Sequence, residues 1–252
     1  MLSRGLGPPW IRTDRPLVYA HRGVNAEAPE NTEAAFALAE IRGADGVELD
    51  VVLCATGEAV VFHDETLARM TGAMGLVRET SFSELRRLRA GGERIPLLEE
   101  ALESTPLLVN VELKCEHAAD AFPLVKAAAR AITRVHADAR VLFSSFHPVA
   151  LWAAARVAPA IVRGLLFESH APLPLRAAWA APLASAVHPQ ASQCDETSVE
   201  RWRARGYAVN AWTVNDDADL DRLCQIGVSG LITDRPARAR EIAERTKNPV
   251  PA

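Results

Sequence analysis

The sequence predicts an α/β fold, a TIM-like (β/α)8 barrel in a single domain. Short apolar runs that are typical of strands alternate with helix-like stretches along the chain, and such alternation indicates a mainly parallel sheet. The length of 252 residues is usual for a one-domain barrel. Several of the apolar runs end in charged or histidine-containing clusters, as expected where barrel strands carry a site at their carboxyl ends.

The apolar runs predict nine strands, one more than a regular barrel contains. We expect these strands at residues 17–21, 46–53, 59–63, 107–113, 140–145, 163–167, 185–189, 207–213 and 229–233. The stretches between them predict helices at residues 32–42, 81–90, 97–104, 118–135, 148–157, 173–183, 196–205 and 216–226. Asn31 is the expected N-terminal cap of the first helix, and Gly43 is expected to end it.

The connection between the second and third strands is irregular. Residues 51–58 are too few to hold the crossover helix that joins two parallel strands. A plain hairpin would send His63 to the opposite end of the sheet from Asp50. If the two residues belong to one site, the segment must double back so that both strands point the same way.

A long excursion follows the third strand. We interpret it as a small insertion over one rim of the barrel, at about residues 64–96, and not as a second domain. The predicted organisation is an N-terminal extension over residues 1–16, a barrel over residues 17–245 and a C-terminal tail over residues 246–252.

The composition argues against several classes of protein. The net charge of -4 and the 24% of charged residues are ordinary for a soluble protein, and no basic stripe indicates nucleic-acid binding. No apolar run of about 18 residues could span a membrane, and the first sixteen residues lack the apolar stretch of a signal peptide. The four cysteines are far apart and predict buried thiols, not disulfides or a zinc site. We therefore expect a cytoplasmic protein.

Carboxylates gather at the ends of two predicted strands. Side chains alternate along a strand, so Glu48 and Asp50 share one face, and so do Glu112 and Lys114. If these strands lie side by side, the three carboxylates converge, and their oxygens suit a hard divalent cation. The alternatives are solvated strand ends and a simple salt bridge between Glu112 and Lys114. The shared face and the apolar residues between the carboxylates favour the metal site.

Basic and histidine side chains flank these carboxylates. Arg22 can hold a phosphate oxygen with its planar guanidinium, and Lys114 can act as a point charge. His21 and His63 can divide the proton transfers, one accepting a proton from the nucleophile and the other donating one to the leaving group. The combination predicts a metal-assisted enzyme that acts on a phosphoester. We interpret the remaining histidines as structural; for His188, which lies before Pro189 at a predicted strand end, a place in the wall of the pocket is the alternative.

Eight segments occur in the order and at the approximate spacing of the glycerophosphodiester phosphodiesterase family, which the chain resembles from about residue 17 to about residue 238. The segments are His21-Arg22-Gly23, Pro29-Glu30-Asn31-Thr32, Glu48-Leu49-Asp50-Val51, His63-Asp64, Glu112-Leu113-Lys114, Ser144-Ser145-Phe146, Ala211-Trp212-Thr213-Val214-Asn215 and Gly230-Leu231-Ile232-Thr233-Asp234-Arg235-Pro236. The resemblance implies a barrel enzyme that uses Mg²⁺ or Ca²⁺, with Mn²⁺ as a further option. It would cleave a glycerophosphodiester to glycerol 3-phosphate and an alcohol, as the small bacterial cytosolic members do.

The resemblance also implies a role for each matched position. The metal ligands of the family fall on Glu48, Asp50 and Glu112. Its catalytic residues fall on His21, His63, Arg22 and Lys114, and its substrate-binding residues fall on Arg22, Lys114 and Trp212.

Two other functions stay open. A lysophospholipase D acting on lysophospholipids has a similar site, and an apolar groove leading from the metal would favour it; the insertion holds the apolar residues Leu67, Met70, Met74, Leu76 and Val77. A non-catalytic glycerophosphodiester-binding protein is the other alternative, and the intact histidines and carboxylates argue against it. The preferred head group, the oligomeric state and the order of the two histidines also stay open. So does the nucleophile, which is either a hydroxyl of the substrate, giving a cyclic phosphate, or water.

Overall fold

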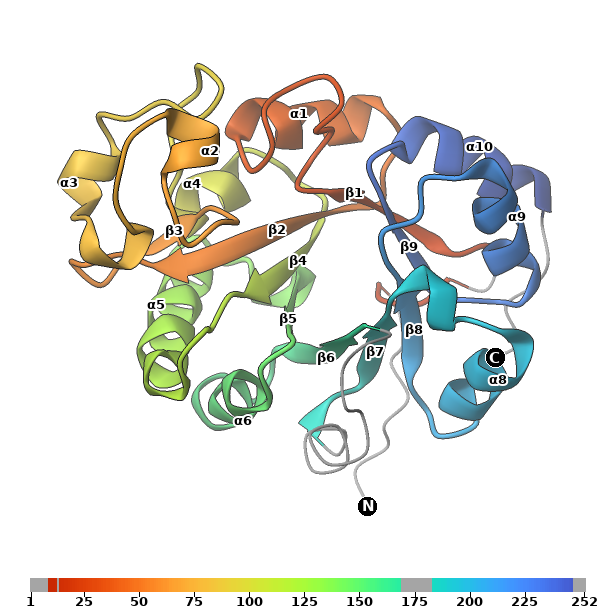
Figure 1. The fold of residues 1–252 in the computed structure, drawn as a ribbon. Helices are drawn as coiled ribbons and strands as arrows, with labels where there is room; N and C mark the ends of the chain where they lie inside the picture. The colour runs from red at the N-terminus through yellow and green to blue at the C-terminus, as the bar shows by residue number, and fades with distance from the viewer. Residues whose placement is uncertain (1–8, 13, 169–182, 247–252) are drawn as a thin grey trace.

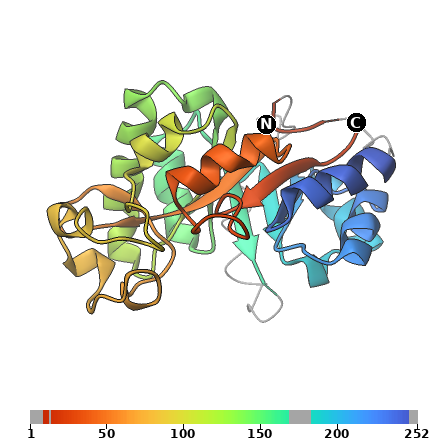
Figure 2. The same ribbon diagram turned by 90° about the horizontal axis from the view of Figure 1, so that it is seen from above.

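Eight parallel strands form a closed barrel in the computed structural model, which describes residues 9–12, 14–168 and 183–246. Figure 1 shows the strands with the helices outside them, and Figure 2 shows the same ribbon from above. In order around the barrel, the strands are β1 (Leu17–His21), β2 (Gly46–Leu53), β4 (Leu108–Leu113), β5 (Val141–Ser145), β6 (Val162–Phe167), β7 (Ala186–Pro189), β8 (Ala208–Ala211) and β9 (Gly230–Thr233). Each strand pairs with the next, and β9 pairs with β1. The predicted barrel is confirmed.

Helices cover the outside of the barrel. They are α1 (Glu33–Ile41), α4 (Leu98–Glu103), α5 (Ala121–Arg134), α6 (Pro148–Val157), α8 (Glu196–Arg203), α9 (Asp217–Gln225) and α10 (Pro236–Thr246). Short 3-10 helices stand before α5, β5 and α8, namely η2 (Ala118–Asp120), η3 (Asp138–Arg140) and η5 (Ala191–Gln193). The sequence pattern did not predict α10, because small residues supply most of its buried face. The helix expected at residues 173–183 lies, apart from its last residue, outside the described residues.

The start of α1 differs from the expectation. Thr32, and not Asn31, caps the helix, because its hydroxyl oxygen accepts a hydrogen bond from the backbone N of Ala35 at 3.3 Å. Asn31 has a φ of 58°, a left-handed conformation that asparagine tolerates better than most residues. Its Nδ2 donates to Oδ2 of Asp50 at 2.9 Å. Asn31 therefore supports a site residue, and Gly43 follows the helix end with a positive φ as expected.

The connection from β2 to β3 (Ala59–Val61) is a hairpin, so the expectation that the two strands point the same way is wrong. Val61 of β3 lies opposite Val51 of β2 in an antiparallel pair. The physical reason is the length of β2, which runs three residues past Asp50 before the chain turns. The returning strand then comes back level with Asp50, whose carbonyl oxygen accepts a hydrogen bond from the backbone N of Phe62 at 3.0 Å. His63 thus reaches Asp50 without a crossover.

The insertion after β3 packs around an apolar cluster of its own. It contains α2 (Ala68–Thr71), η1 (Val77–Glu79) and α3 (Phe82–Leu85), and Figure 1 shows it beside β3 at one edge of the barrel. The helix α3 is shorter than the one expected at residues 81–90. Leu67 and Val77 are buried against Phe62, and Met70 packs on the same cluster. These apolar side chains attach the insertion to the hairpin, and Met74 is exposed.

Apolar side chains close the end of the barrel where the strands begin. Trp10, ahead of β1, is buried and packs against Leu142, Ala186 and Ala208 near the first residues of β5, β7 and β8. The carboxyl ends of the strands form the opposite end. Among the described residues, no helix is both long and apolar enough to cross a membrane.

Candidate active site

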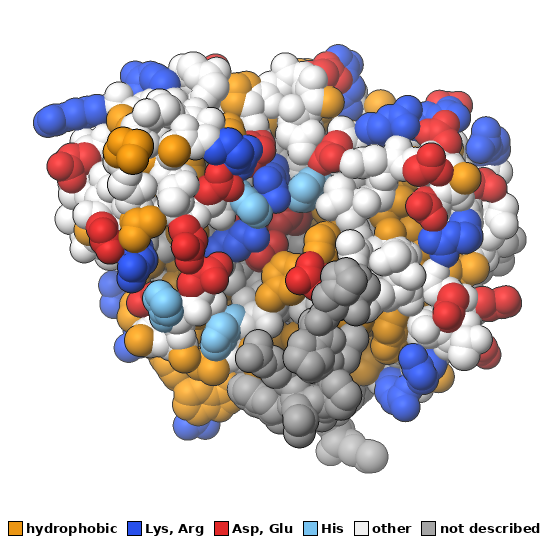
Figure 3. All heavy atoms as spheres, viewed as in Figure 1, with side chains coloured by type: hydrophobic (Ala, Val, Ile, Leu, Met, Phe, Trp, Pro, Cys, Tyr) orange, Lys and Arg blue, Asp and Glu red, His pale blue; other side chains and the backbone are white. Residues whose placement is uncertain are grey.

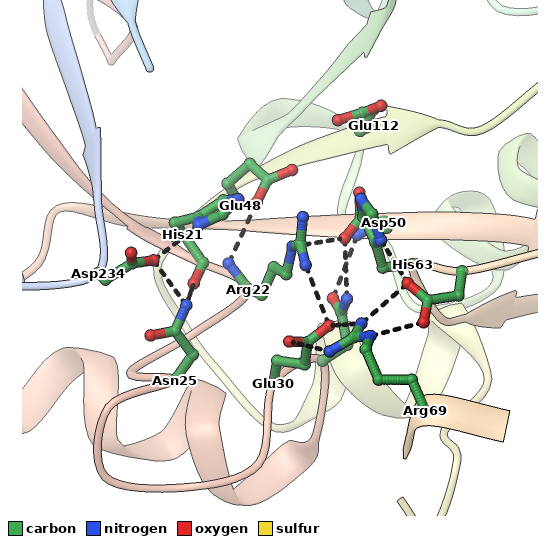
Figure 4. Close-up of polar contacts among 12 residues, drawn as sticks. His21, Arg22, Asn25, Glu30, Glu48, Asp50, His63, Arg69, Glu112 and Asp234 are labelled. Atoms are coloured by element: carbon green, nitrogen blue, oxygen red, sulfur yellow. Dashed lines mark hydrogen bonds and ion pairs between the residues drawn. The ribbon is translucent and has the colours of Figure 1, made fainter. Parts of the chain in front are cut away.

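The predicted site residues meet at the carboxyl ends of adjacent strands. His21 ends β1, and Glu48 and Asp50 lie on β2. The strand register pairs His21 with Glu48 and Asp50 with Glu112 of β4. Figure 4 shows these side chains around Arg22, which points between them. The sequence pattern therefore placed them on the correct strands and faces.

Three buried carboxylates form the centre of the site. Glu48, Asp50 and Glu112 are 4%, 1% and 8% exposed, and one oxygen of each lies within 4.8 Å of the others. Burial, and then the negative charge of Asp50, raises the pKa of Glu48 and of Glu112. The three carboxylates therefore lack the positive charge that would keep all of them ionised.

Asp50 has the most partners of the three carboxylates. Its Oδ1 lies 3.3 Å from Nζ of Lys114, and its Oδ2 lies 3.2 Å from Nε of Arg22. Burial opposes the ionisation of Asp50, but the charges of Lys114 and Arg22 outweigh it and lower the pKa of Asp50. Lys114 also lies 2.8 Å from Oε1 of Glu112. These contacts hold Asp50 ionised between two cations.

This set of ligands fits a hard divalent cation. All three side chains offer carboxylate oxygens, which are the ligands that Mg²⁺, Ca²⁺ and Mn²⁺ prefer. A bound cation would supply the positive charge that Glu48 and Glu112 lack. The buried acidic cluster therefore indicates a divalent metal site, and its oxygens suit each of these three ions.

A carboxylate from the other end of the chain holds His21. Nδ1 of His21 lies 2.7 Å from Oδ1 of Asp234, which follows β9. Asp234 also accepts hydrogen bonds from Nδ2 of Asn25, at 2.6 Å, and from Nδ2 of Asn215. Burial lowers the pKa of His21, but the bond to Asp234 and the charge of Glu48 outweigh it, so the pKa is raised. With Nδ1 engaged, Nε2 is the ring nitrogen available to a substrate.

His63 has a similar carboxylate partner. Its Nδ1 lies 2.8 Å from Oδ1 of Asp64, and burial lowers the pKa of the His63 imidazole. Arg69 of α2 donates to Oδ2 of Asp64 at 2.6 Å and to Oε1 of Glu30 at 2.7 Å. Glu30 in turn accepts a hydrogen bond from Nη1 of Arg22 at 3.1 Å. A chain of polar contacts therefore links His63 to Arg22 through the insertion (Figure 4).

The turn after β1 has a constrained backbone. Arg22 has a φ of 57°, and Gly23 has a φ of 80°. A Cβ at position 23 would lie 2.6 Å from Cβ of Ala35 in α1, so only glycine fits. This turn directs the backbone N of Arg22 to Oε2 of Glu48, which accepts its hydrogen bond at 3.1 Å.

Trp212 lies on the opposite side of the barrel mouth. It follows β8, which is four strands away from β4 in either direction around the ring. Its Nε1 donates to the carbonyl oxygen of His188 at 2.8 Å, and its ring packs edge-on against Phe146 with the centroids 5.3 Å apart. Trp212 thus lies across the barrel mouth from Lys114, and its ring meets Phe146, which follows β5 beside β4.

Sequence reasoning missed the residues that orient the two histidines. Asp64 and Asp234 lie in the matched segments, but no role was predicted for either. The adjacency of Asp64 to His63 was the one available signal. Asp234 reaches His21 only because the barrel closes between β9 and β1, and Arg69 reaches Glu30 only through the fold of the insertion.

A pocket of about 280 Å³ opens beside the acidic cluster. His63 and Lys114 form part of its wall, and the rest comes from the β2–β3 hairpin, from η1 and from the region where α5 begins. Figure 3 shows acidic, basic and histidine side chains gathered in a hollow near the middle of this face.

Comparisons with known proteins agree with this geometry. Residues 21–238 match the model of the glycerophosphoryl diester phosphodiesterase family. The chain belongs to this family. The family match spans the acidic cluster, both histidines and Trp212, and it confirms the resemblance that the eight sequence segments indicate.

The alignments with similar proteins span nearly the whole barrel. Glycerophosphodiester phosphodiesterases of Caldanaerobacter subterraneus and Bacillus altitudinis are 36% and 34% identical to this chain. The alignments cover 88% and 91% of this chain, and 95% and 99% of the relatives. The structure of an Oleispira antarctica phosphodiesterase in complex with the product sn-glycerol-3-phosphate has a TM-score of 0.81 and 32% identity. That likeness covers 90% of this chain and 96% of the other.

Proposed function

We propose that this protein is a metal-dependent phosphodiesterase that hydrolyses glycerophosphodiesters to glycerol 3-phosphate and an alcohol. The observation that carries the proposal is the buried cluster of Glu48, Asp50 and Glu112, with a carboxylate-bound histidine on each side. The names of the family relatives support this activity, and so does the product complex of the Oleispira antarctica enzyme.

The acidic cluster and the two basic side chains beside it, Arg22 and Lys114, would bind the phosphate. Glu48, Asp50 and Glu112 would hold a divalent cation. When bound, this cation neutralises the non-bridging oxygens and stabilises the charge that develops in the transition state. Arg22 and Lys114, which contact Asp50, would bind the remaining phosphate oxygens, Arg22 with its planar fork and Lys114 as a point charge.

His21 and His63 would divide the proton transfers. One accepts a proton from the nucleophile, and the other donates one to the leaving oxygen. Asp234 and Asp64 hold the rings through Nδ1, which leaves Nε2 of each ring toward the substrate. The nucleophile is either the 2-hydroxyl of the glycerol, which would give a cyclic glycerol phosphate, or water. A substrate that lacks the 2-hydroxyl separates these routes, because only direct attack by water cleaves it.

Release of glycerol 3-phosphate tests the proposal. The protein with Mg²⁺ or Ca²⁺ is expected to release it from glycerophosphoethanolamine or glycerophosphocholine. His21→Ala and His63→Ala should each lower kcat on the order of 10²-fold or more. His117→Ala, which removes an exposed histidine, is the matched control and should retain activity. Binding without turnover would indicate a binding protein instead, and turnover of lysophosphatidylcholine alone would indicate a lysophospholipase D.

A further inference from the structure

The pocket beside His63 and Lys114 has no role in the reaction described so far. We propose that it is the subsite of the leaving alcohol and that it selects an alcohol with a primary ammonium group. This inference rests on the proposed function and adds the class of substrate. Three observations support the inference: the position of the pocket, the charges of the pocket wall and the volume of the pocket.

The position of the pocket indicates which half of the substrate it receives. Lys114, which lines the pocket, lies 3.3 Å from Asp50 and 2.8 Å from Glu112. The pocket therefore begins at the edge of the acidic cluster that would hold the phosphate. A phosphodiester has two ester arms, and both need space on leaving the phosphorus atom.

The glycerol arm has a different wall available. Trp212 follows β8, across the barrel mouth from Lys114, and an aromatic face packs well against the carbons of glycerol. The hydrogen bond from Nε1 of Trp212 to the carbonyl oxygen of His188 fixes the ring in this place. With the glycerol against Trp212, the second ester arm would extend across the barrel toward the pocket, whose wall includes His63.

The charges of the pocket favour a cation. Four carboxylates line it, and one of them, Glu79, lies 3.3 Å from Arg78. The side chains of the other three make no hydrogen bond or ion pair with any part of the chain that the structure describes; they are Glu65, Glu116 and Asp120. Figure 3 shows acidic side chains on the flank of the hollow next to the insertion. Two cations also line the pocket, but Arg78 pairs with Glu79, and Lys114 pairs with Asp50 and Glu112. The three other carboxylates of the wall therefore have no ion-pair partner among the described residues.

The kind of cation follows from what else lines the pocket. Apart from the carboxylates, the two cations and His63, the wall consists mainly of aliphatic side chains such as Val52 and Leu124. Among the described residues it contains no aromatic ring of Phe, Tyr or Trp. A quaternary ammonium group is bound mainly by such rings, whereas a primary ammonium group donates hydrogen bonds to carboxylates. The volume of about 280 Å³ is just below the ~300–1,000 Å³ of sites for drug-sized ligands. The pocket therefore suits a short aminoalcohol.

The test compares three substrates with the intact metal-loaded enzyme. We expect kcat/KM to be higher for glycerophosphoethanolamine than for glycerophosphoglycerol, whose head group is neutral, with glycerophosphocholine between them. Glu116→Gln and Asp120→Asn remove charge while keeping shape. Each should reduce the ethanolamine-to-glycerol ratio of kcat/KM by about 5-fold at most, as expected for exposed ion pairs, and the double variant should reduce it further. Added salt should weaken the preference by screening.

A control variant changes a carboxylate outside the pocket. Glu103→Gln removes an exposed carboxylate on α4, away from the pocket, and should leave the ratio unchanged. Equal kcat/KM for glycerophosphoethanolamine and glycerophosphoglycerol, or a ratio that the pocket variants do not alter, would overturn the selectivity and leave the hydrolase activity standing. A complete lack of turnover on every glycerophosphodiester would instead contradict the proposed function, and this inference with it.

Discussion

At the scale of single residues, Asp234 determines how His21 presents its ring. The 2.7 Å contact between Oδ1 of Asp234 and Nδ1 of His21 requires a proton on Nδ1 and leaves Nε2 free to act on a substrate. The carboxylate is itself held by Asn25 and Asn215. Asp234 is therefore a positioning residue, whose effect on the reaction passes through the imidazole.

Asp234→Asn should lower kcat on the order of 10²-fold, because an amide can donate to Nδ1 and reverse the tautomer. KM should change less, since Asp234 does not face the substrate. Steady-state kinetics measure both constants, with thermal unfolding to check the fold. Asp217→Asn, a change in a half-exposed carboxylate of α9 that pairs with Arg238, is the control that should keep kcat. Full activity in Asp234→Asn would show that His21 needs no such partner.

His188 is a histidine that the barrel keeps neutral. It is fully buried, and its Nε2 lies 3.0 Å from Nδ2 of Asn210. The absence of a side chain at Gly164 makes room for it, because a Cβ there would lie 2.5 Å from Nε2. Burial lowers the pKa of His188 from 6.5 to about 3, so the expectation of a structural histidine agrees with its surroundings.

This buried imidazole should make the protein sensitive to acid. The unfolded chain takes up a proton at His188 near pH 6.5, and the folded chain does so only near pH 3. The free energy of unfolding should therefore fall by about 1.4 kcal/mol per pH unit between these values from this residue alone. Denaturant unfolding at pH 7, 6 and 5 should show a shallower dependence in His188→Gln than in the wild type or in His117→Gln. Parallel curves for the wild type and His188→Gln would contradict this.

At the scale of elements, the β2–β3 hairpin shows what a local pattern can and cannot predict. Alternation along β2 correctly placed Glu48 and Asp50 on one face, because that pattern depends on neighbouring residues alone. The direction of β3 depends on how far β2 runs past Asp50 before it turns. Gly57, with a φ of 92°, marks a turn there, but the sequence pattern does not fix the last residue of β2. The role of Asn31 depends likewise on its left-handed backbone, which is not visible in a capping pattern.

The insertion supports the site through Arg69, which joins Asp64 to Glu30. Arg69→Gln removes the charge that holds both carboxylates and should lower kcat by about 10-fold, the lower end of the effect of such supporting contacts. Arg87→Gln, which changes an exposed arginine of the same insertion, should leave kcat unchanged. Equal kcat for the two variants, measured with one substrate at saturation, would show that the insertion does not position His63.

At the scale of the whole molecule, the closed barrel brings the ends of the chain together. β9 pairs with β1, so Asp234 lies next to His21, and the order of the polar segments in the sequence becomes their order around the barrel mouth. The barrel and the acidic cluster were predictable because each strand carries its own apolar run and polar end. The partners of the histidines were not, because each contact joins segments that only the folded chain brings together.

Under the proposed function, hydrolysis requires a divalent cation held by Glu48, Asp50 and Glu112. The most direct measurement is the release of glycerol 3-phosphate in excess chelator, followed by titration with Mg²⁺, Ca²⁺ or Mn²⁺. We expect the chelator to abolish release and the added ion to restore it, with Glu112→Gln requiring a higher concentration of the ion for half-maximal activity. Undiminished release in excess chelator, or an unchanged ion requirement in Glu112→Gln, would contradict the claim.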